Sequence, residues 1–314
     1  MRKMLHTKNW NSKLRVLAVS AKGLIHRELP FRRTLTALRR DRATQKTREV
    51  LKHLLTKEAF EQNSGKMNSK VSSAAFSPVI WTLWLQGFES APDVVKYCQD
   101  KLHGMSPIPV KSLDLKQVLQ IVDMPEKILT LHNSGNVTNV SLSDLIRLRL
   151  LWTYGGIWLD ATVVVRDFEF LAGSRELPYG HLWWADCRLP AEGEKLRTGA
   201  TWAMASSPES HLVGHALICF EELLQKTEGG FHYFDLFHVI SILYESCEIC
   251  HASIIPDDNE GYDDLHDSIL KRKFSKSERI WKTRFMHKLN HKTFIFESKH
   301  RDLLNGFFKG EKSK

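Results

Sequence analysis

The stretch of sequence that most limits the fold runs from Leu150 to Val165 and reads LLWTYGGIWLDATVVV. An apolar segment with helical spacing ends at two glycines, which supply the backbone conformations that end a helix. The segment that follows is rich in β-branched and aromatic residues and predicts a buried strand. Asp160 is a lone carboxylate within this strand, and because burying a charge without a purpose is costly, we expect it to have a role there.

The flanking segments alternate between strand and helix patterns. Strands are expected at 76–87, 107–115, 157–165, 181–189 and 200–206. Helices are expected at 91–105, 114–135 with a break at Pro125, 141–154, 210–227 and 231–249. This alternation predicts an α/β fold whose sheet has a nucleotide-sized crevice at the carboxyl ends of its strands. A polar segment at 63–73 predicts a boundary between a basic helical N-terminal arm, residues 1–70, and a main domain, residues 71–314.

The net charge of +9 is concentrated in the arm. Residues 1–70 hold 18 Lys and Arg and 5 Asp and Glu, a charge of +13, and the other 27 basic and 31 acidic residues give −4. The arm suggests a surface for anionic lipid or nucleic acid, and the alternative is a solvated helical face packed on the main domain. Because the main domain is net acidic, we expect an anionic membrane surface rather than nucleic acid as the partner of residues 1–70.

The cellular location follows from what the sequence lacks. It has no run of about 18 apolar residues, so no transmembrane helix is predicted, and its basic N-terminus lacks the continuous apolar region of a signal peptide. The five cysteines are an odd number, which favours reduced thiols. Residues 247–251, CEICH, match a haem-attachment pattern, but the helical context favours buried thiols. These features predict a cytoplasmic protein, peripheral at the inner face of the cell membrane.

Charged residues on both sides of the Gly-Gly turn form a candidate site. Asp144 and Arg147 are three residues apart and share one face of the predicted helix. The helix is expected to start at a Ser141 or Ser143 cap, which places Asp144 in its first turn. The turn then folds the strand that carries Asp160 back beside this helix. Carboxylate oxygens suit hard divalent cations, and such a cation stabilises the charge of a leaving diphosphate.

The same segment resembles a known family. Residues 143–165, SDLIRLRLLWTYGGIWLDATVVV, are similar to the signature of the capsular polysaccharide synthesis glycosyltransferases, which are related to the DxD-motif sugar transferases of family 32 with a GT-A fold. Residues 79–98 resemble the opening block of that family, with its Trp-x-x-Trp-x-Gln-Gly pattern. Residues 232–245 and 286–294 show weaker similarity. The arm lies outside the resemblance.

The resemblance implies a fold, an activity and a set of site residues. The fold is a GT-A-like, Rossmann-type mixed sheet flanked by helices. The activity is transfer of a sugar from a nucleotide sugar, expected to be a uridine diphosphate sugar, to a polysaccharide or lipid-linked glycan in capsule synthesis. The catalytic positions are Asp144, Arg147 and Asp160; the donor-binding positions are Trp84, Gln86, Asp144, Arg147, Thr162 and Lys288; the metal positions are Asp160 and His287. Further candidates to hold metal or diphosphate are Asp235 and His238.

Purely structural roles remain possible for several of these residues. Trp84 also fits a core aromatic, Arg147 a salt-bridge partner of Asp144, and His238 a buried core histidine. The sequence also departs from DxD, because Ala161 and Thr162 follow Asp160 where a second carboxylate is usual. Thr162 offers a neutral oxygen, so Mn²⁺ or Mg²⁺ is expected to bind more weakly unless another ligand helps. The alternative function is a non-catalytic binding or scaffolding subunit of the same fold.

Overall fold

The computed structural model describes residues 42–56, 58–62, 78–168, 182–184, 201–226, 235–248, 250, 254–256, 264–292 and 296–309. The boundary segment expected at 63–73 and most of the arm lie outside these residues. Within them, no helix is long and apolar enough to cross a membrane.

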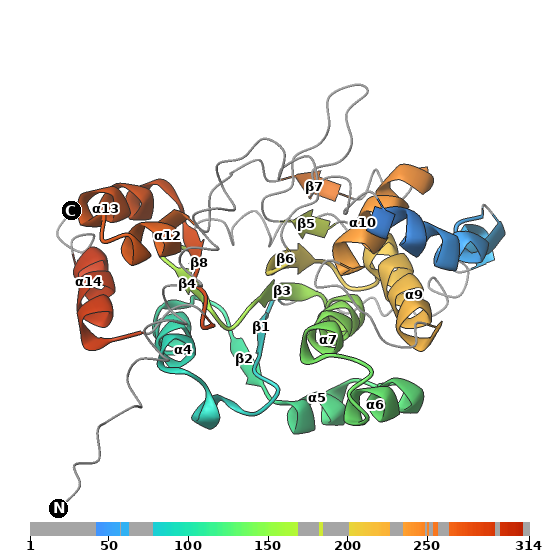
Figure 1. Cartoon of the computed structure of the whole chain (residues 1–314), viewed down its shortest axis with the longest axis horizontal. Coiled ribbons are helices and arrows are strands. Elements are labelled where there is room, and N and C mark those ends of the chain that lie inside the picture. Colours follow the sequence, from blue (N-terminus) through green and yellow to red (C-terminus); the bar gives the residue numbers. More distant parts are fainter. Residues whose placement is uncertain are drawn as a thin grey trace, which may run out of the picture. The chain divides into compact units, whose positions relative to one another are not determined.

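A mixed sheet forms the centre of the main domain (Figure 1). Its strand order is β2-β1-β3-β6-β5-β7. The strands are β1 (Ile80–Leu83), β2 (Val110–Leu113), β3 (Gly156–Leu159), β5 (Leu182–Trp184), β6 (Ala203–Ser206) and β7 (Ile254–Pro256). Strand β1 is parallel to both β2 and β3, whereas β6 is antiparallel to β3 and β5. The predicted α/β class with a mixed sheet flanked by helices is confirmed.

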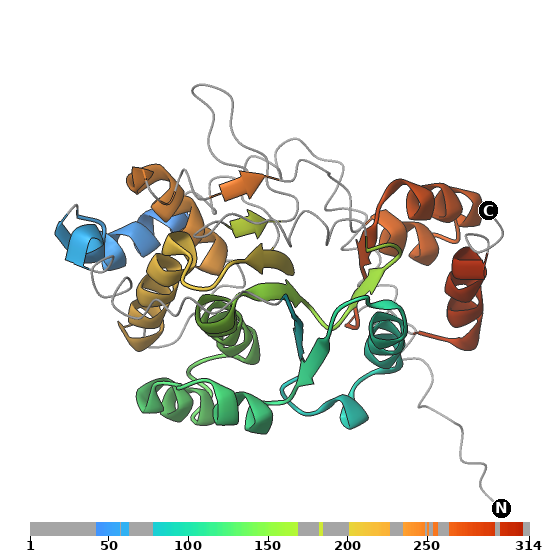
Figure 2. The ribbon, with the colours of Figure 1, turned by 180° about the vertical axis from the view of Figure 1, so that it is seen from behind.

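Helices flank this sheet on both sides (Figures 1 and 2). On one side lie α7 (Asn139–Tyr154), α9 (His211–Lys226) and α10 (Asp235–Ser246), and on the other lie α4 (Asp93–Met105), α12 (Asp264–Leu270), α13 (Phe274–Thr283) and α14 (Ser298–Lys309). The short helices α5 (Leu115–Ile121) and α6 (Glu126–Asn133) follow β2, and the 3₁₀ turns are η1 (Lys52–Leu54) and η2 (Phe88–Ser90). Separate clusters of buried apolar side chains fill the two sides, one around Phe220 and one around Trp281.

Helix α7 begins earlier than the sequence predicts. Its N-cap is Thr138, whose hydroxyl accepts a hydrogen bond from the Ser141 N–H at 3.1 Å. The predicted caps at Ser141 and Ser143 are therefore wrong, and Asp144 lies in the second turn, not the first. Thr138 satisfies a free N–H group of the first turn as well as a serine would, so the sequence offers several equivalent starts.

The Gly-Gly turn ends α7 as predicted and joins it closely to the sheet. Gly155 and Gly156 have φ values of 63° and 101°, which residues with a Cβ rarely adopt. The Trp81 indole N–H donates to the Gly155 carbonyl at 2.8 Å. A Cβ on Gly156 would lie 2.5 Å from the Val79 carbonyl oxygen. The turn therefore requires glycine both for its backbone angles and for the close approach of β1.

The single strand predicted at 157–165 is wrong, because it divides at Asp160 into two strands in different sheets. Strand β3 ends at Leu159, and β4 (Val163–Val165) pairs antiparallel with β8 (Met286–Lys288) in a separate two-stranded sheet. The Asp160 N–H donates to the Trp202 carbonyl at 2.8 Å, and the Asp160 carbonyl accepts from the Val163 N–H at 2.9 Å. A tight turn thus carries Asp160 between the two sheets.

Part of the segment assigned to the arm belongs to the body of the protein. The chain divides into compact units at 1–46 and 47–314. Leu51 and Phe60 are buried in the same core cluster as α9, and the Arg48 guanidinium pairs with Glu245 of α10 at 2.7 Å. The compact unit therefore starts well before the boundary predicted at residue 70, because apolar side chains within a basic segment pack in the core.

Replacing Gly156 with alanine should strongly destabilise the protein. The added Cβ meets a backbone carbonyl and the backbone stays at a positive φ, so we expect a loss of about 3 kcal/mol or more in the free energy of unfolding. The matched control is Gly104→Ala on α4, where nothing lies within 4 Å of the new Cβ. That change should stabilise by up to about 1 kcal/mol. Urea unfolding measures both, and equal midpoints for the two variants would contradict the role of the turn.

Candidate active site

The topology places a switch point at the carboxyl ends of β1 and β3. From β1 the chain runs through α4 to β2 on one side, and from β2 it runs through α7 to β3 on the other. The two connections thus leave neighbouring strands toward opposite faces of the sheet, which makes the gap between β1 and β3 a topological switch point. Ligands of open α/β sheets bind at such switch points, outside the carboxyl ends of the strands. Trp84 follows β1 directly, and Asp160 follows β3. The site predicted from the sequence thus occupies the position that the topology favours.

Asp160 is held by three donors from three elements of the chain, α7, β3 and β8. Its Oδ1 accepts from the Arg147 guanidinium at 2.9 Å and from the Trp158 indole N–H at 2.9 Å. Its Oδ2 accepts from the Lys288 ammonium at 2.6 Å. Both carboxylate oxygens therefore face positive charge, and the side chain is fixed in one orientation.

Arg147 lies beneath Asp160 and joins it to Asp144. Its guanidinium donates to the Asp144 carboxylate at 2.6 Å and lies 4.8 Å from the centre of the Trp158 ring. The exposed fraction of the side chain falls from 24% at Asp160 to 4% at Arg147. Asp144, Arg147, Asp160 and Lys288 form a row of alternating charges, named here the charge ladder. It leads from the core to the switch point.

Burial and neighbouring charges shift the pKa values of Asp144 and Asp160 in opposite directions. Burial raises the pKa of Asp144 to about 7, although Arg147 acts against it, and the nearby Asp160 and Asp235 add to the rise. Burial also acts to raise the pKa of Asp160, but Lys288 and Arg147 together hold that pKa below its usual value. Asp160 is consequently ionised at neutral pH, whereas Asp144 is close to its midpoint.

The neighbours Lys288 and His287 point to opposite sides of β8. Side chains alternate along a strand, so when Lys288 reaches Asp160, His287 must face away. The His287 side chain is buried, with its ring stacked on Trp281 at 5.1 Å between centroids. Burial lowers the pKa of His287 to about 3, so the ring is neutral. The structure does not bring His287, expected as a metal ligand, to Asp160.

The other predicted donor-binding residues lie on the segments that follow β1 and β3. Trp84 is half-buried, and its ring meets that of His291 edge to face at 5.1 Å. Thr162 is buried, and its carbonyl accepts from the Leu289 N–H at 2.9 Å. Gln86 is exposed on the loop after β1. Burial, Lys292 and Lys288 lower the pKa of His291, a residue that no pattern in the sequence marks as part of the site.

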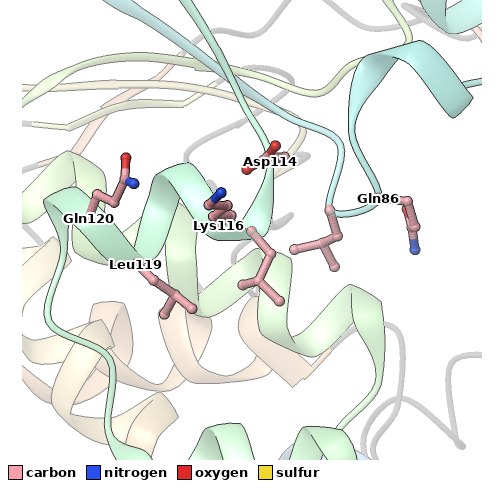
Figure 3. A pocket seen from close by; sticks show the side chains of 7 residues that line it. Gln86, Asp114, Lys116, Leu119 and Gln120 are labelled. Atoms are coloured by element: carbon pink, nitrogen blue, oxygen red, sulfur yellow. The ribbon is translucent and has the colours of Figure 1, made fainter.

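A hollow of about 500 Å³ lies beside Gln86, at the ends of β1 and β2. Figure 3 shows Gln86 on the loop after β1, apart from the side chains of Asp114, Lys116, Leu119 and Gln120, which lie along α5 and its N-cap. The lining residues are Leu85, Gln86, Asp114, Leu115, Lys116, Leu119 and Gln120. Amide, carboxylate and ammonium groups above an apolar floor suit a ligand that is partly polar. Asp160 and Lys288 are not among the lining residues.

Some residues that support the site were missed or left open by the sequence. Trp158 stands two residues before Asp160 in a strand, so the alternation of side chains could have revealed that both face the same way. Gln99 of α4 donates to Thr82 at 3.3 Å and approaches the Ala161 carbonyl at 3.5 Å, which no sequence spacing predicts. The candidates Asp235 and His238 are buried on α10.

The site residues fit a divalent metal poorly in this arrangement. A metal on Oδ2 of Asp160 would meet the Lys288 ammonium, which already lies 2.6 Å from that oxygen. A divalent ion about 4 Å from an ammonium is repelled by about 8 kcal/mol at an effective dielectric constant of about 20. Among the described residues, no group of three or more His, Cys, Asp and Glu side chains is placed to hold a metal.

Comparison of the sequence with models of protein families shows which family the chain belongs to. The family model described as capsular polysaccharide synthesis protein matches residues 32–307. The chain belongs to the capsular polysaccharide synthesis protein family. The match includes the Gly-Gly turn and every member of the charge ladder, and the family suspected from the sequence is confirmed. It also begins at residue 32, so part of the arm belongs to the family region, contrary to the sequence-based expectation.

Comparison with individual proteins adds less. No curated protein matches this member of the family. A solved structure, "PaToxG Glycosyltransferase", is similar at 12% sequence identity with a TM-score of 0.35, over 87% of this chain and 96% of that chain. A likeness at this level supports neither a shared activity nor a shared substrate.

The raised pKa of Asp144 predicts a pH dependence of stability. The pKa is about 7 in the folded chain, against 3.8 ordinarily. The folded chain favours the protonated form of Asp144, so the contribution of this residue to stability is complete below pH 4 and is lost as pH rises through about 7. The free energy of unfolding of the wild type should fall relative to that of Asp144→Asn across this window, by at most about 1.4 kcal/mol per pH unit.

Urea unfolding at pH 5, 6 and 7 measures this difference. Asp100→Asn, which changes an exposed aspartate on α4, is the control and should keep the pH dependence of the wild type. A constant difference between wild type and Asp144→Asn over this range would contradict the assignment.

Proposed function

We propose that the protein is a glycosyltransferase that transfers a sugar from a nucleotide sugar to a polysaccharide or lipid-linked glycan during capsule synthesis. The observation that supports this most is the outer end of the charge ladder. A fixed carboxylate and a fixed ammonium, Asp160 and Lys288, lie together at the topological switch point of an α/β sheet. The membership of the capsular polysaccharide synthesis family gives the class of product.

The proposed reaction is a displacement at the anomeric carbon of the donor sugar. The bond from that carbon to the diphosphate oxygen breaks, and its electron pair leaves with the nucleoside diphosphate. The acceptor hydroxyl oxygen forms the new bond to the same carbon and releases its proton, which the leaving phosphate is able to accept. The residues of the ladder bind and orient the donor for this step.

The structure supports different roles for the two ends of the ladder. Lys288 and Asp160 are partly accessible, with 18% and 24% of their side chains exposed, and are the members able to touch a donor. Arg147 and Asp144 are buried and act as positioning residues that fix Asp160 from beneath. The hollow beside Gln86 has the size and the mixed lining to take the nucleoside part of a donor.

A non-catalytic binding subunit is the second candidate. It is favoured by the charge balance of Asp160, whose oxygens already have partners, and by the missing second carboxylate at Thr162. Such a subunit would bind a nucleotide or glycan without turnover. Turnover therefore separates the two functions.

Incubation with a panel of nucleotide sugars, with and without Mn²⁺, tests the activity. We expect the wild type to release a nucleoside diphosphate from at least one donor, and Asp160→Asn to lower kcat roughly 100-fold or more, because the oriented charge is lost. Asp100→Asn, on an exposed surface of α4, should leave kcat unchanged. Thermal unfolding confirms that each variant is folded. If no donor is bound or turned over by the wild type, the proposal fails; if one is bound but never turned over, the binding subunit is correct.

We also propose that the basic arm attaches the protein to an anionic membrane surface, where lipid-linked acceptors lie. Residues 1–70 have a net charge of +13, whereas the rest of the chain is net acidic. Deleting residues 1–41 leaves the compact unit 47–314 intact, whereas deleting residues 1–70 would remove Leu51 and Phe60 from the core.

Flotation with vesicles tests this attachment. The full chain should float with vesicles that contain phosphatidylglycerol, less so at high salt, and not with phosphatidylcholine alone. The chain without residues 1–41 should remain in the lower fraction. Equal flotation of both chains would assign membrane binding, if any, to another surface.

A further inference from the structure

We propose that the Lys288 ammonium takes the place of a divalent metal opposite the donor diphosphate, so that donor binding does not need a divalent cation. This inference rests on the proposed function and goes beyond it. It concerns which group neutralises the charge of the leaving diphosphate. It arises from the poor fit between the residues around Asp160 and a divalent ion.

The first argument is the occupation of Asp160. A metal-binding aspartate must direct a free lone pair at the ion, but here Oδ1 accepts two hydrogen bonds and Oδ2 accepts one from Lys288. An ion on the remaining lone pair of Oδ2 would lie beside the positive charge of that ammonium. Lys288 thus plays the electrostatic part that the ion plays elsewhere, with one positive charge on the outer side of the carboxylate.

The second argument is the rigidity of the lysine. Lys288 belongs to β8, and its backbone is paired with Val163 of β4, directly after the turn that carries Asp160. The next residue, Leu289, donates its N–H to the Thr162 carbonyl at 2.9 Å. The strand pairing fixes the backbone, and the hydrogen bond to Asp160 holds the ammonium in place before any ligand arrives. A preorganised cation stabilises developing negative charge without rearranging.

The third argument is the number of donors that Lys288 offers. An ammonium has three N–H groups, and one of them donates to Asp160. Within the described residues no other hydrogen bond of this ammonium is found, and 18% of the side chain is exposed. Two donors are thus able to meet phosphate oxygens. As the bond to the anomeric carbon breaks, its electron pair passes to the diphosphate, and this added charge develops beside Lys288.

The fourth argument is the residue that replaces the second acid. Thr162 is buried, and its backbone carbonyl accepts a hydrogen bond from the Leu289 N–H, directly after β8. Ala161 is buried among apolar side chains of α4 and α13. Neither residue places a second carboxylate beside Asp160, and His287 faces the other side of β8 against Trp281. The neighbours of Asp160 therefore supply cations and not metal ligands.

Calorimetric titration of uridine diphosphate, and of other nucleoside diphosphates if that one fails, tests the inference. Each titration is done in EDTA and again with Mn²⁺. The wild type should bind with the same affinity, within about twofold, in both. Lys288→Ala should weaken binding in EDTA by roughly 10- to 100-fold, the value of a hydrogen bond to a charged group. Lys288→Arg should keep most of the affinity, and so should the control Lys292→Ala, which changes an exposed lysine beside the site.

The outcomes separate this inference from the proposed function. Binding by the wild type only with Mn²⁺ would overturn the role of Lys288 and leave the transferase in place. Unchanged affinity in folded Lys288→Ala would also overturn it. Failure of the wild type to bind any nucleoside diphosphate under either condition would overturn both. Electron paramagnetic resonance of Mn²⁺ gives an independent measurement: the wild type without nucleotide should leave the free-ion signal unchanged, and a loss of that signal would contradict the inference.

Discussion

The ion pairs of Arg147 are the interaction on which the site depends. The guanidinium lies between the carboxylates of Asp144 and Asp160 and over the face of Trp158, with almost no contact with water. A buried arginine keeps its charge, and Asp160 is the partner that stays ionised. Removing Asp160 would therefore leave the guanidinium partly uncompensated, which is far more costly than losing a surface ion pair. The pair with Asp160 ties the third turn of α7 to the turn that follows β3, and this connection fixes the orientation of the Asp160 side chain.

The local features of this region could be predicted from the sequence because they depend on neighbouring residues. The Gly-Gly end of α7, the strand before Asp160 and the shared face of Asp144 and Arg147 all follow from periodicity and glycine. The division of the strand at Asp160 could not be predicted. Residues 157–165 have a continuous preference for strand, and only pairing with the distant β8 moves the second half into another sheet.

Contacts between distant residues account for the other differences. The sequence marks both His287 and Lys288, but the alternation of a strand lets only one of them face Asp160, and which one depends on the register with β4. In the same way, the basic composition of residues 1–70 gives no sign that Leu51 and Phe60 are buried in the core. Their packing partners lie far along the chain, on α9 and its neighbours. Composition describes a segment as a whole, whereas burial is decided residue by residue.

The separation of Asp160 and Lys288 along the chain has a consequence for biosynthesis. They are 128 residues apart, and a ribosome that adds roughly 5–20 residues per second needs about 10 s to cover that distance. During this interval β1, β2 and β3 are already made, but the outer cation of the site is missing. A nascent chain therefore contains the strands at the centre of its sheet well before it contains Lys288, so the ladder is completed only after β8 has been made.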